Sequence, residues 1–391
     1  MIKQSNRSNI PSFLALEGLR KAKALEADGA DIIHLEIGQP STSAPAPVQQ
    51  AMIAAMSDNE THGYSVAMGM PELRHAISDH YDHSYGFKDA FDKIAITVGS
   101  STAFALAFMA AFDEGDRIAL PTPGYPAYRN LMMAMGIEPL ALPARAEESW
   151  MPSLKEMESW DELPDGLIVA SPHNPTGVVL SDAELKEICA WCDMHGVRLI
   201  SDEIYHGISY HKPTTTVAHH SNSAIIISGF SKYFSMTGWR LGWMLMPDDL
   251  MVPIQKLIES LYISAPTPNQ IGALKAFDAQ EELDANIARY RVNRDILLNG
   301  LAPEFLGNHA PCDGAFYLYA DVSAISDDSL QLADDLLSKA GVAVTSGVDF
   351  DPTQGHRYVR LSFAGATEDM HEAVRRINAF VQSEFRVKSI A

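Results

Sequence analysis

The sequence has little of what marks a secreted or membrane protein. Its 391 residues include only three cysteines, too few for a disulfide framework. No apolar run reaches the roughly eighteen residues that a membrane-spanning helix needs. The first residues, M-I-K-Q-S-N-R-S-N-I, lack the apolar segment of a signal peptide. Together these absences predict a cytoplasmic protein without a membrane partner.

Basic residues are also scarce. The chain has 29 lysines and arginines against 50 aspartates and glutamates, so its formal net charge is −21. Such an acidic surface argues against nucleic acids and anionic membranes as partners, because both repel it. Any phosphate site must therefore be a local positive island. The length and the 47% of hydrophobic residues fit a globular protein with two domains.

Common nucleotide and metal motifs are missing as well. Neither a Walker A loop nor a G-x-G-x-x-G pattern stands out, and the histidines lack the spacing of a metal site, so no metal is expected. One C-x-x-C pair, Cys189 and Cys192, is present. Redox pairs usually lie at a helix N-terminus, where the thiolate is stabilised. Because this pair lies well past the expected helix cap at Ser181, helix packing is the better interpretation.

The most informative stretch is residues 224–246, A-I-I-I-S-G-F-S-K-Y-F-S-M-T-G-W-R-L-G-W-M-L-M. Two apolar runs that predict buried strands enclose a turn with a single lysine, Lys232, and with Arg240 eight residues later. A lysine amine is nucleophilic only when neutral, and a low-dielectric pocket or a nearby cation lowers its pKa. Small residues such as Ser231 leave room and donors for an anionic ligand. The stretch therefore suits a lysine that forms a Schiff base.

The segment G-F-S-K-Y-F-S-M-T-G-W-R-L-G resembles the pyridoxal-phosphate attachment signature of class I aminotransferases. The resemblance implies that Lys232 binds pyridoxal 5′-phosphate covalently and that Arg240 pairs with its phosphate. It covers residues 31–364 of the chain. It also implies a fold type I architecture, a homodimer with shared active sites, and ping-pong transfer of an amino group from an L-amino acid to a 2-oxo acid.

Polar and aromatic residues follow the other expected strands, at 93–98, 117–120, 167–170 and 198–201. Since sites in parallel sheets lie at the carboxyl ends of the strands, we expect these residues to lie together. The resemblance implies that Lys232, Asp202 and Tyr205 are catalytic. It implies the following cofactor contacts: Ser100, Ser101 and Ser231 at the phosphate, Tyr125 on the ring face, Asn174 and Tyr205 at the ring oxygen, and Asp202 at the ring nitrogen.

Substrate contacts follow from the resemblance in the same way. It implies that Gly38, Asn174 and Arg360 bind the substrate, with Arg360 holding the α-carboxylate. It also implies that Tyr64 reaches the cofactor phosphate of the neighbouring subunit. Arg360 lies in Y-V-R-L-S-F-A, where alternation with apolar residues places its guanidinium toward the cleft. The chain departs from many relatives at residues 346–348, S-G-V, where they have Pro-Gly.

Without the resemblance, several of these residues have plainer interpretations. Lys232 is then a solvated loop lysine, Asp202 a helix cap and Arg360 a surface charge on an edge strand. The Gly-Ser turn at 99–102 either binds an anion or simply starts a helix. Two other functions also stay open beside the aminotransferase: a pyridoxal-phosphate-dependent carbon–sulfur lyase that releases ammonia, and a non-catalytic sensing module.

Strands followed by helices through residues 93–246 predict an α/β protein with a mostly parallel sheet and helices on both faces. The C-terminal part has a second α/β pattern and predicts a smaller domain. We expect residues 1–44 to form an arm and part of the small domain, 45–285 the large cofactor-binding domain, and 286–391 the rest of the small domain.

Three local expectations concern single helices and strands outside residues 93–246. Ser12 is expected to cap a helix that runs to about Ala27, because a hydroxyl there can accept a first-turn N–H. Residues 31–37 are expected to form a strand that ends at Gly38. Residues 314–318 are expected to form the first strand of the small domain.

Overall fold

The structure is a computed structural model that describes residues 2–88, 90–146 and 150–388. Within these residues the largest element is a seven-stranded sheet with the order β2–β8–β7–β6–β5–β3–β4. β8 runs antiparallel to its neighbours β2 and β7, whereas the other pairs are parallel. The expected mostly parallel sheet is confirmed. The strands are β2 (Ile94–Thr97), β3 (Arg117–Thr122), β4 (Glu138–Pro143), β5 (Gly166–Ala170), β6 (Arg198–Asp202), β7 (Ile225–Gly229) and β8 (Gly242–Leu245).

Helices cover both faces of this sheet, because side chains alternate along each buried strand. On one face, Ile168 and Ile200 pack with α4, α5 and α8. On the other face, Leu167 and Leu199 pack with α3 and α7. The helices of this part are α2 (Ala46–Met56), α3 (Pro71–Tyr85), α4 (Gly99–Ala111), α5 (Pro126–Met135), α6 (Leu154–Glu158), α7 (Asp182–His195), α8 (Met251–Leu261) and α9 (Thr267–Leu274).

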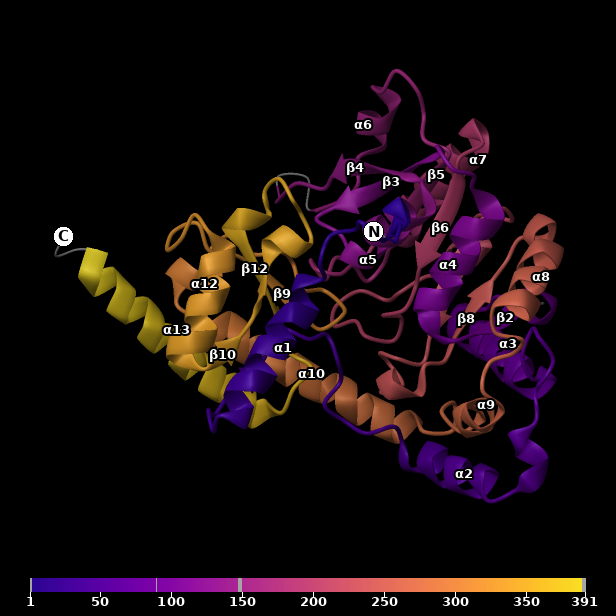
Figure 1. The fold of residues 1–391 in the computed structure, drawn as a ribbon, viewed down its shortest axis with the longest axis horizontal. Coiled ribbons are helices and arrows are strands. Elements are labelled where there is room, and N and C mark those ends of the chain that lie inside the picture. The colour runs from indigo at the N-terminus through magenta and orange to yellow at the C-terminus, as the bar shows by residue number, and fades with distance from the viewer. Residues whose placement is uncertain (1, 89, 147–149, 389–391) are drawn as a thin grey trace.

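A second part of the molecule is built around a three-stranded antiparallel sheet, β11–β12–β9. Figure 1 shows it at the opposite end from α8, with α10 running between the two parts and α1 lying over the second part. Its elements are α1 (Leu14–Ala27), β1 (Ile33–His34), α10 (Gln280–Gly300), α11 (Pro303–Leu306), β9 (Tyr317–Asp321), α12 (Ser329–Asp335), β10 (Val342–Ala343), β11 (Thr345–Ser346), β12 (Tyr358–Ser362) and α13 (Thr367–Lys388). The N-terminal segment and the C-terminal part thus share one unit.

The predicted helix cap at Ser12 is wrong. α1 begins at Leu14, Phe13 holds the N-cap position, and no side chain at that position caps the helix. Instead, the backbone N–H groups of Leu14 and Ala15 donate to the carboxylate of Asp349 at 3.2 and 3.1 Å. The tertiary fold brings in a carboxylate from far along the sequence, and it replaces the local hydroxyl.

Two predicted strands differ from the structure. The strand expected at 314–318 begins at Tyr317 instead, because Gly314 forms a β-bridge with Ser209 in the loop after β6. The strand expected at 31–37 is shorter, because β1 pairs with β10 over only two residues. In both cases, the partner that a segment meets decides where its strand begins and ends.

Two further observations bear on possible functions. No helix in the described part of the chain is long and apolar enough to cross a lipid bilayer, and no cluster of His, Cys, Asp and Glu side chains there is placed to hold a metal ion. Cys189 and Cys192 are free and buried in α7. Burial raises the pKa of the Cys189 thiol to about 12, so this thiol is protonated and unreactive. These facts support helix packing over a redox role.

Candidate active site

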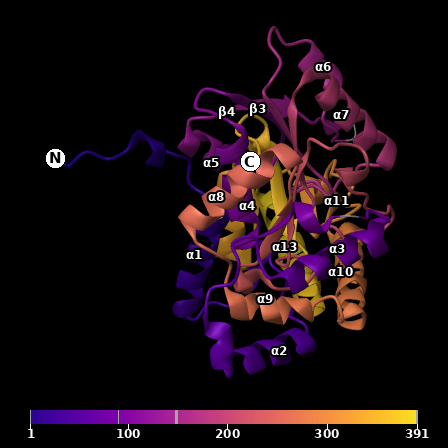
Figure 2. The same ribbon diagram turned by 90° about the vertical axis from the view of Figure 1, so that its right-hand side faces the viewer.

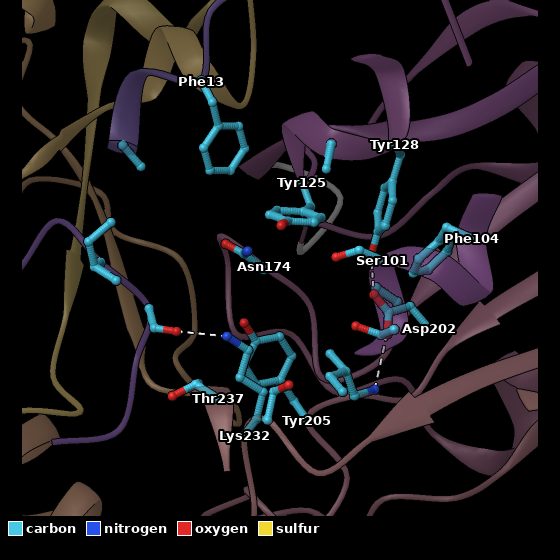
Figure 3. Close-up of a pocket in the computed structure, with 18 of the residues that line it drawn as sticks. Phe13, Ser101, Phe104, Tyr125, Tyr128, Asn174, Asp202, Tyr205, Lys232 and Thr237 are labelled. Carbon is cyan, nitrogen blue, oxygen red and sulfur yellow. Dashed lines mark hydrogen bonds between the residues drawn. The ribbon is translucent and has the colours of Figure 1, made fainter. Parts of the chain in front are cut away.

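A cavity of about 230 Å³ lies at the carboxyl ends of β5 and β6, where the large sheet meets the second part of the molecule. Asp202, the last residue of β6, lines it from the large sheet, and Arg360 of β12 lines it from the smaller one. Phe13 points toward Tyr125, across the cavity from Lys232 (Figure 3). A crevice at this edge is the usual ligand site of an open α/β sheet.

Lys232 lies in the turn between β7 and β8 and projects into the cavity. Its Nζ donates a hydrogen bond to the carbonyl oxygen of Gly38 at 2.7 Å. The pKa of Lys232 is lowered to about 8, first by burial and then by the positive charges of Arg360 and Arg240, against the opposing effect of Asp202. A useful fraction of the amine is therefore neutral and nucleophilic near neutral pH.

Asp202 holds a buried carboxylate at the bottom of the same cavity. The backbone N–H of Ile204 donates to its Oδ1 at 3.0 Å, and the hydroxyl of Tyr128 donates to its Oδ2. Burial raises the pKa of Asp202 to about 6, while these two donors and Lys232 hold it down. The carboxylate is thus charged above about pH 6 and can hold a cationic group in the cavity.

Tyr128 was not identified from the sequence, although a signal exists. It lies one helical turn after Tyr125 in Y-P-A-Y, so both rings lie on the same side of α5. The two rings contact each other edge to face at 5.2 Å. Such spacing at a helix start that follows a strand end could have pointed to a second aromatic residue in the site.

Tyr317 was also missed, because nothing local marks it among the other apolar residues of β9. Its hydroxyl lies 2.6 Å from the hydroxyl of Tyr205, and its ring lies 4.3 Å from the Arg360 guanidinium. A Cβ atom at Gly38 would lie 1.8 Å from the Tyr317 hydroxyl. Glycine at position 38 is therefore required for Tyr317 to reach the site.

One end of the cavity is suited to an anion. α4 begins at Gly99 without a side-chain cap, and Ser100 and Ser101 of its first turn line the cavity. A Cβ atom at Gly99 would lie 2.6 Å from Nη2 of Arg240, so this glycine lets the guanidinium approach the helix start. Free N–H groups, hydroxyls and a cation therefore converge, as a phosphate site requires.

Arg360 occupies the opposite wall and is 4% exposed. Its Nη1 donates to Oδ1 of Asn174 at 3.0 Å, and its Nη2 donates to the carbonyl oxygen of Glu36 at 2.7 Å. Among the described residues no carboxylate bonds to it directly, although Asp349 interacts with it through space, and its Nε has no hydrogen-bond partner. A buried guanidinium without a directly bonded counter-ion is well suited to bind a carboxylate ligand.

The structure brings almost all of the predicted site residues together around this cavity. Those that line it are Gly38, Ser100, Ser101, Tyr125, Asn174, Asp202, Tyr205, Ser231, Lys232, Arg240 and Arg360. Tyr64 does not line it. That side chain is 80% exposed and lies in the loop before α3, outside the cavity of its own chain.

Sequence comparisons place this chain among proteins of known activity. The family model for class I and II aminotransferases matches residues 30–377. The valine–pyruvate aminotransferase of Mycobacterium tuberculosis is 44% identical over 97% of this chain and 98% of that protein. A (5-formylfuran-3-yl)methyl phosphate transaminase of Methanocaldococcus jannaschii is 34% identical over 95% of this chain and 98% of that protein.

Solved structures are similar over the same length. An aminotransferase from Mycobacterium tuberculosis superposes with a TM-score of 0.95 at 43% identity, covering 98% of this chain and all of that one. The aspartate aminotransferase of Thermus thermophilus with maleate gives a TM-score of 0.90 at 28% identity, covering 97% of this chain. The similarity therefore includes both parts of the molecule.

Proposed function

The chain belongs to the class I and II aminotransferases, and we propose that its amino donors are L-amino acids with apolar side chains. As a member of this family it is an enzyme that uses pyridoxal 5′-phosphate to transfer an amino group from an amino acid to a 2-oxo acid. Family membership leaves the substrate side chain open. The lining of the cavity supports an apolar one.

The observation that carries the proposal is the chemistry of the cavity wall. Among the described lining residues the only cations are Lys232, Arg240 and Arg360. Each is already assigned to another group: the lysine to the cofactor aldehyde, Arg240 to the cofactor phosphate and Arg360 to the substrate α-carboxylate. A dicarboxylic amino acid would require a further cation for its side chain. The wall contains these apolar side chains instead: Phe13, Leu16, Ile37 and Leu131. The relative named valine–pyruvate aminotransferase supports a branched donor, with pyruvate as the acceptor.

The residues around the cavity fit the cofactor. We propose that the start of α4 and Arg240 hold its phosphate, because the close approach at Gly99 builds a positively charged cradle there. Tyr125 would cover the ring face, and Asn174 and Tyr205 would donate to the ring oxygen. Ser231 contributes a hydroxyl beside the phosphate cradle. Lys232 would form the covalent link, and its lowered pKa supports this role.

The proposed mechanism assigns each step to a side chain. When bound, the cofactor supplies an aldehyde carbon that takes up the amino group and a ring that accepts electrons. Arg360 holds the substrate α-carboxylate with its forked guanidinium. Lys232 Nζ would take the proton from the substrate α-carbon as a general base and deliver it, as a general acid, to the cofactor carbon that bears the amino group; the second half-reaction would reverse this transfer. Asp202 remains ionised and would hold the positive charge of the ring nitrogen.

We further propose ping-pong kinetics and a homodimer. The first oxo acid leaves before the second binds, because both use the same carboxylate site on Arg360.

Tyr64 and the neighbouring Val66 are 80% and 58% exposed, which suits residues that a second subunit covers. The segment before α1 extends away from the body of the molecule (Figure 2), as expected of an arm that reaches a partner. In this dimer Tyr64 contributes to the partner's phosphate site.

The domain limits and the cellular setting remain proposals too. Residues 45–285 form the large domain, while 1–44 and 286–391 form the small one. Two core clusters, one around each sheet, support this division, and Tyr319 packs into the first and Tyr205 into the second where the two parts meet. The three free cysteines support a reducing, cytoplasmic setting.

A donor panel tests the proposed substrate class. The holoenzyme is supplied with pyruvate and with valine, leucine, isoleucine, aspartate or glutamate, and kcat/KM is measured for each donor. We expect the apolar donors to be preferred by about tenfold or more. A preference for aspartate or glutamate would refute the proposal. Release of ammonia without consumption of pyruvate would indicate a lyase instead.

A further inference from the structure

The turn after β11 connects several parts of the active site. The carbonyl oxygen of Phe350 accepts the backbone N–H of Gly124, next to Tyr125, at 3.0 Å. The ring of Phe350 lies 4.7 Å from the guanidinium of Arg360. The turn is therefore fixed both to the loop that bears the ring-covering tyrosine and to the strand that bears the carboxylate-binding arginine.

The S-G-V departure from the family pattern lies in this turn. The hydroxyl of Ser346 accepts the backbone N–H of Val348 at 3.2 Å and lies 2.7 Å from the hydroxyl of Ser329. A proline would restrict the backbone but could make neither contact. The chain thus orders the turn with hydrogen bonds where many relatives use a ring.

Helix α1, which approaches this turn, has its main apolar contact in its second half, where Ala22 and Leu25 pack against Ile32 and Leu337. Of its 14 residues, only Ala15 and Ala22 are buried. Helices in proteins depend mainly on packing of an apolar face, and in the first turn of α1 only Ala15 is buried. The position of this first turn must therefore depend strongly on its polar contacts.

Asp349 makes the polar contact at the start of α1. It is 2% exposed, and each of its two carboxylate oxygens accepts one N–H of the first helical turn, from Leu14 and from Ala15. Its own carbonyl oxygen accepts from Nη2 of Arg129 at 3.3 Å, which ties it to α5. The negative charge also interacts favourably with the helix N-terminus and, through space, with Arg360.

The part of α1 that Asp349 holds is the part that faces the cavity. The ring of Phe13 contacts the ring of Tyr125 edge to face at 5.8 Å, and Leu16 lines the same opening. Figure 3 shows Phe13 across the cavity from Lys232. A substrate whose amino group meets the lysine and whose side chain extends across the cavity would reach Phe13.

We propose that Asp349 is a positioning residue for the substrate side chain: by capping α1, it holds Phe13 and Leu16 as the apolar wall that selects branched amino donors. The inference rests on the proposed function and extends it, because it assigns the preference to a residue that does not touch the substrate. Asp349 acts through α1, and what it affects is the binding of the substrate side chain.

The test compares valine with alanine as donors in the holoenzyme. Asp349→Ala removes both acceptors, and Asp349→Asn keeps the shape but replaces one acceptor with a donor. We expect both variants to lower the ratio of kcat/KM for valine over alanine by about tenfold, since alanine lacks the methyl groups that contact the wall. The loss should fall mainly on KM, and alanine turnover should change by less than about twofold.

Asp351 offers a matched control in the same turn. It is also buried, but its Oδ1 accepts the N–H groups of Thr353 and Gln354 at 2.8 and 3.0 Å within its own loop. Asp351→Asn should leave the valine to alanine ratio unchanged. Melting temperature and cofactor absorbance of each variant show whether it is folded and loaded.

A double-mutant cycle with Phe13→Ala tests the route of the effect. If Asp349 acts through α1, the double variant loses no more of the ratio than the larger of the two single losses. The inference would be overturned if the losses of the valine to alanine ratio in the two single variants multiplied in the double variant. It would also be overturned if Asp349→Ala left the ratio unchanged or lowered kcat/KM equally for both donors. A wild-type enzyme without a preference for apolar donors would refute the proposed substrate class itself, which is a separate result.

Discussion

Asp202 and Glu203 are consecutive buried carboxyls on opposite sides of the large sheet. Asp202 lines the cavity, where the hydroxyl of Tyr128 donates to it. Glu203 turns away from the cavity, and its Oε1 accepts from the hydroxyl of Thr216 and the backbone N–H of Val217, both at 3.0 Å. Two adjacent residues of the same chemical type thus have separate surroundings.

Their charges differ as a result. Burial raises the pKa of Asp202 to about 6 and that of Glu203 to about 8. Oε2 of Glu203 lies 3.5 Å from Nδ1 of His206, and burial lowers the pKa of that histidine to about 3. Near pH 7, Asp202 is therefore mostly ionised, whereas Glu203 is protonated and His206 is neutral.

The difference shows that burial alone does not make a carboxyl catalytic. A buried charge is costly unless a partner compensates it, so the side without a ligand cavity keeps its carboxyl neutral. The cavity side keeps its carboxylate ionised because Lys232 lies nearby and because a cationic ligand group can enter. Substitutions on the two sides should therefore have different effects.

The largest expected effect is on the cavity side, at the lysine. Lys232→Ala removes the proposed covalent anchor and the proposed proton-transfer group, so we expect amino transfer to fall about 10,000-fold or more. The measurement is the rate of oxo-acid formation with added pyridoxal 5′-phosphate. Lys275→Ala, at an exposed lysine that pairs with Asp278, serves as the control and should keep full activity. Intact turnover in Lys232→Ala would disprove the assignment.

Asp202→Asn should have the next largest effect. The amide has the same shape but no charge, so it cannot stabilise a cationic ring nitrogen, and we expect kcat to fall about 100- to 1,000-fold. Single-turnover kinetics of the holoenzyme measure this loss. The neighbouring Glu203→Gln is the matched control. Equal losses in the two variants would remove the distinction between the two sides of the sheet.

Tyr128→Phe should change the pH profile more than the maximal rate. The Tyr128 hydroxyl lowers the pKa of Asp202, so its removal raises that pKa above about 6 and shifts the acid limb of kcat/KM to higher pH. We expect roughly a threefold to tenfold loss near pH 6 and little change near pH 8. Tyr319→Phe is the control. It also removes a buried tyrosine hydroxyl, but one without a hydrogen-bond partner among the described residues. An unmoved acid limb would contradict this role for Tyr128.

The smallest expected effect on activity is that of Glu203→Gln, within about twofold of wild type. Its effect should appear in stability instead. The folded pKa of Glu203 is raised from 4.5 to about 8, so its contribution to stability is present below about pH 4.5 and is lost as pH rises through 8. Melting temperatures across this range should therefore fall less steeply in the variant than in wild type. Glu187→Gln, at an exposed glutamate of α7, should follow the wild-type curve.

Sequence patterns predicted the site best where a residue follows a buried strand. Ser100, Asp202 and Lys232 all follow such runs, and the geometry of a parallel sheet brings these positions to one edge. The long attachment signature added the cofactor, which no single residue indicates. The tyrosines at 128 and 317 were missed because their roles depend on partners distant in the sequence, 74 residues away for one and 112 for the other.

The start of α1 shows the same limit. A hydroxyl at Ser12 is a reasonable local cap, but the helix begins two residues later and uses a carboxylate 335 positions away. Local patterns describe contacts between near neighbours, whereas a cap from Asp349 exists only once the N-terminal segment packs against the turn after β11.

By itself, the sequence determined the parallel sheet, the family and the residues at the strand ends, because alternation of apolar residues and a long motif are local properties. Only the tertiary structure decided which carboxyl keeps its charge, which tyrosines reach the site and what holds α1 over the cavity. Each of these depends on desolvation and on contacts between distant segments, and such quantities have no value until the chain is folded.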